Sequence, residues 1–437
     1  MKLLSNTRLV VATARLGWVT LACGVMACEP AADPSSNDSG HGGTAAPAEA
    51  GSGGVGAIGG AGGGAPSATG GTPGGAVGGT SSAGSGGNVE VNGGTTGGDV
   101  GTGDAGNGGE GQGASSPVIP PPLEPALMSR CTGTRPIRCS IPVSANGNYH
   151  VTVELGSAQA ASSSRVEAEL ARVVVPTIEL AAGEFSQHTF SVNVRDEIHD
   201  DYTYPGKQLD VSIDGDAPAL RGLGYAAADI PTLFVAGDST VCDSDPVRPE
   251  RGWAQELSMY LKPGLAVANY ADAGDTAGSL YSKFAKRGAL LKKGDYLFIQ
   301  FGHNDMKSAA DTASYKANVM KFVADARSAL ATPVLFSPVA RRAYLDDRSK
   351  PTTLADPGFN GLDQQARDLA ASEHLAFVDL TTLAIQYYAT VDAPALFSSR
   401  TEIAHFNTKG ATAISQLVVD ALKAGTTPAT SIADFLK

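Results

Sequence analysis

The carboxyl-terminal half of the sequence predicts an α/β fold in which helices cover both faces of a parallel sheet. Short apolar runs, at residues 233–236, 296–301 and 334–336, alternate with stretches of helical spacing, at residues 313–330 and 409–423. Strands that alternate with helices form parallel sheets, because each return to the same sheet needs a crossover connection. Polar residues follow several of the apolar runs, so we expect a functional site where the strands end.

The first 28 residues predict an export signal. Lys2 and Arg8 precede a mostly apolar stretch, which ends on the sequence VMAC at Cys28. This ending resembles a bacterial lipobox, which implies cleavage before Cys28 and lipid attachment to it; Cys23 is a poorer alternative. Arg15 interrupts the apolar stretch, which favours a processed signal over a transmembrane helix. We expect an exported protein, either a cell-envelope lipoprotein or an extracellular one, with a lipid anchor as its only link to a membrane.

Residues 29–128 predict a long disordered linker. The stretch from Ala31 to Pro120 holds 32 of the 54 glycines, and no Lys or Arg occurs between Arg15 and Arg130. Such a segment has too little apolar surface to offset the entropy lost on folding. The glycines follow no strict period, which argues against a collagen helix or a glycine-repeat solenoid.

Residues 129–230 predict a small antiparallel β-sandwich. Short runs in this region alternate between apolar and polar residues with a period of two, and Gly, Pro and Asn separate them. This alternation is typical of strands with one buried face. The expected strands are residues 149–155, 172–175, 189–194 and 209–213.

The cysteines and histidines outside the export signal have structural interpretations. Cys131 and Cys139 flank a short loop, and in an oxidising compartment we expect a disulfide between them. Cys242 is left over, and we interpret it as a small buried side chain rather than a nucleophile. The histidines of residues 129–230 are scattered, which favours strand-face or surface positions over a metal site. These histidines are His150, His188 and His199.

Four polar segments in residues 231–437 follow predicted strands or precede the last helix. They read GDST from residue 237, NYADAGDT from residue 269, GHND from residue 302 and EIAHFN from residue 402. Because active sites of open α/β sheets lie at the carboxyl ends of the strands, these segments are the candidates for chemistry.

The four segments supply the groups that acyl transfer requires. Ser239 would attack a carbonyl, and His405 would take its proton and return it to the leaving alcohol. Glu402, three residues before the histidine, can accept a hydrogen bond from the far ring nitrogen. The backbone N–H groups of Ser239 and Gly274 and the side-chain amide of Asn304 are the candidate oxyanion donors.

The four segments resemble the four sequence blocks of the SGNH (GDSL) hydrolases. The GDST turn, the Asn-x-Ala-x-x-Gly loop, the QFGHND run and the HFNTKGA ending are most similar to rhamnogalacturonan acetylesterase-like enzymes, as is SPVARRAY at residues 337–344. The resemblance covers residues 232–422. It implies a flavodoxin-like three-layer domain that hydrolyses O-acetyl esters on a polysaccharide, without a metal or other cofactor. The preceding sandwich is similar to galactose-binding-like modules.

The chain departs from the pattern of that family in two of the four blocks. The family has Asp three residues before the histidine, and this chain has Glu402, whose stem is one methylene longer. Some serine hydrolases use glutamate in this role. The second block usually reads Gly-Arg-Ser, and here Asp275 replaces the arginine, which argues against an acidic pectic backbone as the substrate.

Alternative functions remain open at this point. The esterase could act on another acetylated glycan, such as xylan, or on a short-chain ester. The chain could instead be a carbohydrate-binding surface protein whose catalysis is impaired, with Glu402 and Asp275 as signs of the loss. The net charge of −12 argues against nucleic acid as a partner. The sequence does not indicate an oligomeric state.

Overall fold

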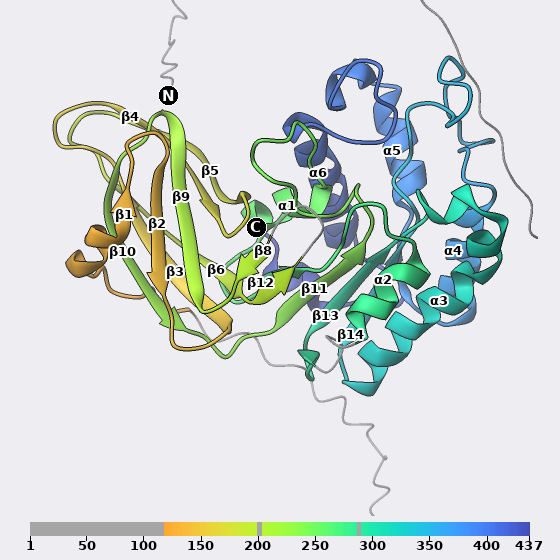
Figure 1. Cartoon of the computed structure of the whole chain (residues 1–437), viewed down its shortest axis with the longest axis horizontal. Coiled ribbons are helices and arrows are strands. Elements are labelled where there is room, and N and C mark those ends of the chain that lie inside the picture. Colours follow the sequence, from red (N-terminus) through yellow and green to blue (C-terminus); the bar gives the residue numbers. More distant parts are fainter. Residues whose placement is uncertain (1–117, 199–202, 286–289) are drawn as a thin grey trace, which may run out of the picture. The chain divides into compact units, whose positions relative to one another are not determined.

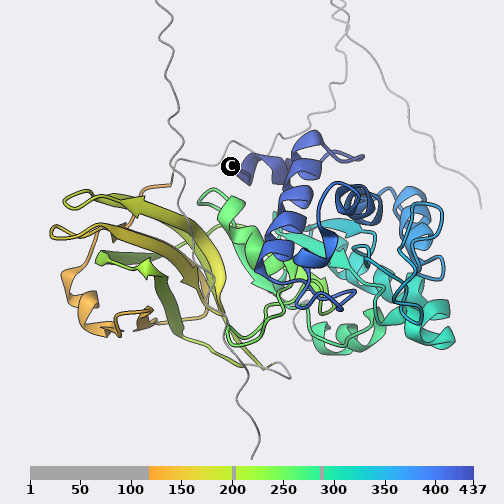
Figure 2. The same ribbon diagram turned by 90° about the horizontal axis from the view of Figure 1, so that it is seen from above.

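The computed structural model describes residues 118–198, 203–285 and 290–437, which belong to one compact unit (Figures 1 and 2). The predicted export signal with Cys28, most of the predicted linker, and His199 lie outside the described residues. Among the described helices, none is both long and apolar enough to cross a membrane.

The amino-terminal part of the described chain contains two antiparallel sheets, as the alternating sequence runs predict. One sheet has the strand order β1-β2-β9-β4-β5, the other has the order β10-β3-β6, and β7 pairs with β8 in a separate hairpin. The first helical element is the short 3₁₀ helix η1 (Pro125–Arg130). The strands are β1 (Cys131–Thr132), β2 (Ile137–Pro142), β3 (Gly147–Leu155), β4 (Ser162–Ala168), β5 (Arg172–Leu180), β6 (Ser186–Val194), β7 (Asp196–Ile198), β8 (Thr203–Pro205), β9 (Gln208–Ala217) and β10 (Leu220–Ala227).

Alternate residues of these strands form the sandwich core. Leu209, Val211 and Ile213 of β9 are buried, as are Val151 and Val153 of β3, and the intervening side chains of β9 are partly exposed. The sequence did not predict β2, β4 or β10 as strands. In β4 the sequence SSSRVEA has few apolar residues, so the period-two signal is weak although several of its polar side chains are buried.

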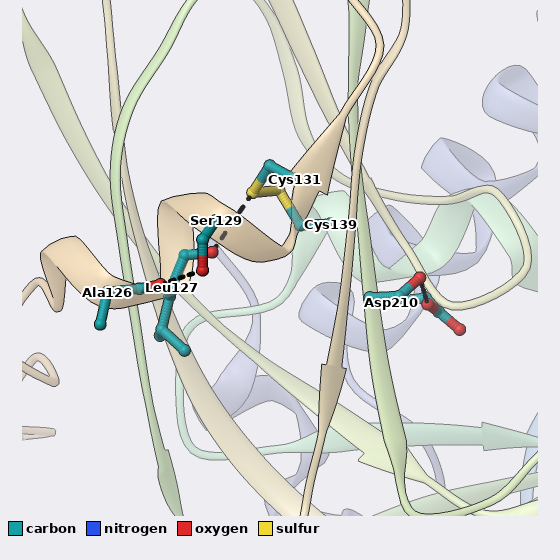
Figure 3. The surroundings of a disulfide bond; sticks show 7 residues. Ala126, Leu127, Ser129, Cys131, Cys139 and Asp210 are labelled. Carbon is teal, nitrogen blue, oxygen red and sulfur yellow. Dashed lines mark hydrogen bonds between the residues drawn. A yellow bond between two sulfur atoms is a disulfide. The ribbon is translucent and has the colours of Figure 1, made fainter.

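A disulfide joins Cys131 to Cys139 near the amino-terminal end of the sandwich (Figure 3). The two cysteines lie directly opposite each other in the antiparallel pair of β1 and β2. In the preceding η1, the Ser129 hydroxyl donates a hydrogen bond to the carbonyl oxygen of Ala126 at 2.7 Å. Cys242 is a free, buried cysteine.

The carboxyl-terminal part is built on a five-stranded parallel sheet, which confirms the α/β prediction. The strand order is β12-β11-β13-β14-β15, and every neighbouring pair is parallel. The chain moves from β11 to β12 on one side and then to β13 on the other. Such a reversal leaves a crevice outside the carboxyl ends of the two strands between which it occurs, here β11 and β13. The strands are β11 (Thr232–Gly237), β12 (Ala266–Asn269), β13 (Tyr296–Gln300), β14 (Thr332–Phe336) and β15 (Ala376–Val378).

Helices cover both faces of this sheet (Figures 1 and 2). Successive strand side chains point to opposite faces. Leu233 and Val235 of β11 therefore pack with α1, α5 and α6, whereas Phe234 and Ala236 pack with α2, α3 and α4. The helices are α1 (Trp253–Leu257), η2 (Ser258–Tyr260), α2 (Ala277–Phe284), η4 (Asp305–Lys307), α3 (Ala309–Ser328), α4 (Leu362–Ser372), α5 (Leu380–Tyr388), η5 (Ala393–Leu396), α6 (Thr408–Ala424) and η6 (Ser431–Phe435).

The helix boundaries follow capping residues that the periodicity alone does not locate. Helix α3 begins at residue 309, four residues before the predicted start, because the Ser308 hydroxyl accepts a hydrogen bond from the Asp311 N–H. Helix α6 begins after Asn407, whose side chain accepts from the Gly410 N–H. Helix α1 has only five residues and continues directly as the 3₁₀ helix η2.

Candidate active site

Ser239 lies in the tight turn that follows β11. A Cβ atom on Gly237 would lie 2.7 Å from Val241 Cγ2 and 2.9 Å from the Gln300 carbonyl oxygen, so a larger residue does not fit at the end of this strand. The buried Asp238 carboxylate accepts hydrogen bonds from the N–H and the hydroxyl of Thr240, at 3.0 and 2.7 Å. These contacts fix the backbone on both sides of the serine.

Buried side chains tie this turn to β13. Gln300 Nε2 donates to Thr240 Oγ1 at 2.9 Å, and Gln300 Oε1 accepts from the Trp253 indole N–H at 2.9 Å. The His303 N–H donates to Asp238 Oδ2 at 3.3 Å, which joins the serine turn to the loop that carries Asn304. Burial raises the pKa of Asp238, and the hydrogen bonds from Thr240 and His303 oppose that rise. The sequence analysis did not assign site roles to Thr240, Gln300 or Trp253.

The structure brings Ser239, His405 and Glu402 together. Ser239 Oγ lies 3.0 Å from His405 Nε2, which is hydrogen-bond distance for a nucleophile and its base. His405 Nδ1 lies 3.5 Å from Glu402 Oε1. That distance is longer than an ordinary hydrogen bond. About 40% of the His405 side chain and 25% of the Glu402 side chain are exposed, so the site opens to solvent.

Backbone groups hold the carboxylate of Glu402 in place. Its Oε1 accepts hydrogen bonds from the N–H groups of Ile403, Ala404 and His405, at 2.8, 2.9 and 3.4 Å. Burial raises the pKa of Glu402, but these N–H groups and the His405 charge outweigh it, so the net pKa lies below the usual value. The longer stem of glutamate thus folds back onto the following backbone, and an anion stays beside the ring.

The candidate oxyanion donors Gly274 and Asn304 stand on the loops after β12 and β13. Gly274 has a φ of +80°, in the left-handed region that favours glycine. Asn304 Nδ2 donates to the Asp275 carbonyl oxygen at 2.9 Å, and Asn304 Oδ1 accepts from Lys307 Nζ at 2.8 Å. These two partners set the orientation of the amide and leave its second N–H for another acceptor. The sequence analysis did not identify Lys307.

The negative charge of Asp275, which departs from the family pattern, is paired. Lys283 Nζ of α2 lies 2.9 Å from a carboxylate oxygen of Asp275 and 2.9 Å from one of Asp272. Burial lowers the pKa of Lys283, but the two carboxylates more than reverse this and raise it above its usual value. Because Lys283 offsets part of this negative charge, Asp275 counts less against an acidic substrate than an isolated carboxylate would.

Asp305 and His303, which flank Asn304, are both engaged within the protein. Asp305 Oδ1 accepts a hydrogen bond from the Ala277 N–H at the start of α2, at 3.0 Å. His303 Nε2 lies 2.8 Å from the Val339 carbonyl oxygen, and Arg341 Nε donates to His303 Nδ1 at 3.2 Å. Burial, with a smaller contribution from Arg341, lowers the pKa of His303 well below its usual value, so the ring stays neutral.

Residues 235–413 match the family model of the GDSL-like Lipase/Acylhydrolase family. This match extends from β11 into α6 and so covers most of the α/β part of the chain. The matched range includes Ser239, Gly274, Asn304, Glu402 and His405. The chain is therefore an ester hydrolase of the SGNH (GDSL) type, as its resemblance to the four sequence blocks implies.

Several Bacillus subtilis proteins are similar to this chain. The rhamnogalacturonan acetylesterase RhgT is 28% identical over 215 residues, which cover 44% of this chain and 89% of RhgT. The probable rhamnogalacturonan acetylesterase YesY is 26% identical over 205 residues, which cover 44% of this chain and 92% of YesY. The crystal structure of YxiM is 24% identical with a TM-score of 0.42, and it covers 66% of this chain and 80% of the YxiM chain.

Proposed function

We propose that the protein is an exported serine esterase that removes O-acetyl groups from a polysaccharide. The observation that carries this proposal is the distance of 3.0 Å between Ser239 Oγ and His405 Nε2, at the carboxyl end of β11. The names of RhgT and YesY support an acetylated glycan, with rhamnogalacturonan as the first candidate.

In the proposed mechanism Ser239 Oγ attacks the acetyl carbonyl carbon while its proton passes to His405 Nε2. The tetrahedral oxyanion accepts hydrogen bonds from the N–H groups of Ser239 and Gly274 and from the second N–H of the Asn304 amide. When the intermediate collapses, the ester C–O bond breaks and His405 returns the proton to the sugar oxygen. Water then attacks the acetyl-serine with the same base, releases acetate and restores the Ser239 hydroxyl.

Glu402 acts in this scheme mainly through its charge. His405 gains a proton in each transition state, and a carboxylate 3.5 Å from Nδ1 stabilises the resulting imidazolium. The three backbone N–H groups on Oε1 keep Glu402 anionic as the pH falls, because they lower its pKa. A glutamate held in this way supports activity rather than a decayed site.

We further propose that the sugar chain lies in a surface depression beside Asn304. This depression has a volume of about 960 Å³, and Met306, Lys307 and Tyr344 are among its lining residues. Ligand sites occupy roughly 300–1,000 Å³. Phe359, which also lines the depression, packs edge-on against the His303 ring with a centroid distance of 5.2 Å. The wall of the depression therefore contacts the residue directly before the oxyanion-hole asparagine.

Export and lipid attachment at Cys28 remain part of the proposal. The sequence of residues 1–28 supports them through its charged start, apolar stretch and cysteine at the cleavage position. Labelling of bacteria that express the chain with a clickable palmitate analogue tests this. Label on the wild type and none on Cys28→Ser supports lipidation, and equal label on both contradicts it.

Acetate release from a panel of acetylated polysaccharides tests the proposed substrate. The panel contains acetylated rhamnogalacturonan, homogalacturonan and xylan, and each is treated with the wild type and with Ser239→Ala. We expect release by the wild type only, fastest on rhamnogalacturonan. Release of acetate from acetylated xylan alone would identify xylan, and not rhamnogalacturonan, as the substrate. Glycan binding without release by the wild type would indicate an impaired, carbohydrate-binding protein.

A further inference from the structure

The β-sandwich supplies two buried arginines to the edge of the hydrolase sheet. Strand β12 stands at one edge of that sheet, so alternate backbone carbonyls along it face away from β11. Arg172 Nη1 donates to the Val267 carbonyl oxygen at 2.5 Å, and Arg195 Nη2 donates to the Asn269 carbonyl oxygen at 2.7 Å. The two arginines are only 2% and 4% exposed. The two arginines therefore donate hydrogen bonds to two alternate carbonyl groups of β12, both of which face away from β11.

Arg172 also forms a buried ion pair with the segment that follows the nucleophile. Arg172 Nε lies 2.9 Å from Asp243 Oδ2, and 3% and 0% of the two side chains are exposed. A buried ion pair is stable only when further hydrogen bonds compensate for the lost hydration. Asp243 Oδ1 meets this condition because it accepts from Asn269 Nδ2 at 2.9 Å.

Asn269 connects this ion pair to both loops of the active site. Its second N–H donates to the Val241 carbonyl oxygen at 3.0 Å, two residues after Ser239. Its Oδ1 accepts from the Ala271 N–H at 3.1 Å, at the start of the loop that leads to Gly274. The Asn269 side chain therefore joins the nucleophile turn to the oxyanion loop, and Arg172 holds it through Asp243.

Further hydrogen bonds and a cation–π contact hold the sandwich against the α/β part. Gln255 Nε2 in α1 donates to the Leu170 carbonyl oxygen at 2.9 Å, and the Gly264 N–H donates to Ser191 Oγ at 3.0 Å. The Arg195 guanidinium lies 5.1 Å from the centroid of the Tyr270 ring. Each of these contacts joins a residue of the sandwich to the α/β part within one compact unit.

From these contacts we propose that Arg172 is a positioning residue for the esterase site, and that the sandwich is a structural part of the hydrolase rather than an independently moving glycan-binding module. The proposal rests on the esterase activity of the Ser239 site. Without Arg172, the buried Asp243 carboxylate loses its ion pair with the Arg172 guanidinium. The Asp243–Asn269 contact then rearranges, and Ser239 and Gly274 lose their common support.

The test compares Arg172→Met and Arg172→Lys with the wild type in the full chain. Arg135→Met is the matched control, because Arg135 forms an exposed ion pair with Asp216 in the same sandwich. The assay measures kcat and KM for a chromogenic acetate, at a temperature well below each Tm. The concentration of active enzyme is taken from labelling of Ser239 with a fluorophosphonate.

We expect kcat per labelled serine to fall roughly tenfold or more in Arg172→Met, because small displacements of reacting groups are costly, while KM stays within about twofold. Arg172→Lys keeps the charge and should recover part of the loss, and Arg135→Met should match the wild type. The inference is wrong if Arg172→Met keeps the kcat of the wild type. It is also wrong if the substitution leaves kcat unchanged and only raises KM on a polysaccharide. Absence of turnover by the wild type would instead refute the proposed esterase.

Calorimetry of the wild type tests the proposal even if Arg172→Met does not fold. A sandwich that is part of the hydrolase fold unfolds together with it, so we expect one cooperative transition. Two separated transitions, one for the sandwich and one for the α/β part, would overturn the inference.

Discussion

The buried carboxyl group of Asp305 predicts that the protein loses stability as the pH rises from about 4 to 7. Asp305 is 1% exposed, and among the described residues its Oδ2 has no hydrogen-bond partner. Burial raises its pKa from 3.8 to about 7, and the nearby Asp238 adds to the rise. The carboxyl group is therefore neutral in the folded protein at mildly acidic pH.

The sign of the effect follows from proton binding. Between pH 3.8 and about 7 the folded protein holds a proton on Asp305 that the unfolded chain has lost. Stability falls with increasing pH wherever the folded state binds more protons. A difference of about 3 pKa units corresponds to about 4 kcal/mol, at 1.36 kcal/mol per unit. The loss begins above pH 3.8 and is complete above pH 7.

Asp305→Asn isolates this contribution. Asparagine keeps an oxygen that can accept from the Ala277 N–H but does not titrate. The free energy of unfolding is measured in urea at pH 4 and at pH 7. We expect its decrease between these two pH values to be about 4 kcal/mol smaller in Asp305→Asn than in the wild type. Asp420→Asn, an exposed position on α6, should keep the wild-type slope. Parallel slopes for wild type and Asp305→Asn would show that Asp305 does not hold this extra proton in the folded protein.

Three further variants test other contacts of the site. Glu402→Gln keeps an oxygen for the backbone N–H groups but removes the charge, so kcat on a chromogenic acetate should fall about 10- to 100-fold; an unchanged rate means that another carboxylate supports His405. Lys307→Met removes one of the two partners that orient the Asn304 amide and should lower kcat roughly tenfold at constant KM; a change in KM alone would contradict this role. Lys283→Met removes the ammonium group that Asp272 and Asp275 share, and urea unfolding should show a loss of about 1–2 kcal/mol, because Lys283 is partly exposed; wild-type stability would show that these two ion pairs do not stabilise the fold.

The strands of the sheet and the four site segments could be predicted because their signals are local. Strand β11 is an apolar run that ends on Gly237, and a polar turn follows it directly. The same pattern marks β13 and the segment with Asn304. Helices α2 (Ala277–Phe284) and α5 (Leu380–Tyr388) were missed. The first is short, and the second, LTTLAIQYY, is a short run of mainly apolar residues whose pattern does not distinguish a helix from a strand.

The supporting contacts of the site could not be predicted because they join residues far apart in the sequence. Arg172 contacts Asp243 across 71 positions and the Val267 carbonyl across 95. Nothing near Arg172 in the sequence distinguishes it from a surface arginine on a strand. The position of Lys283 depends likewise on how α2 packs beside the loop with Asp275. The sequence shows that Asp275 replaces the arginine of the family pattern, but it does not show that Lys283 pairs with this carboxylate.

Identification of the residue that becomes acetylated during turnover tests directly whether Ser239 is the nucleophile of an acetylesterase. The wild type is mixed rapidly with a chromogenic acetate, quenched in acid, digested and analysed by mass spectrometry. For the wild type we expect one acetylated peptide, modified at Ser239. For Ser239→Ala we expect no acetylated peptide and no turnover. An acetyl group on another residue, or turnover that persists in Ser239→Ala, would contradict this expectation.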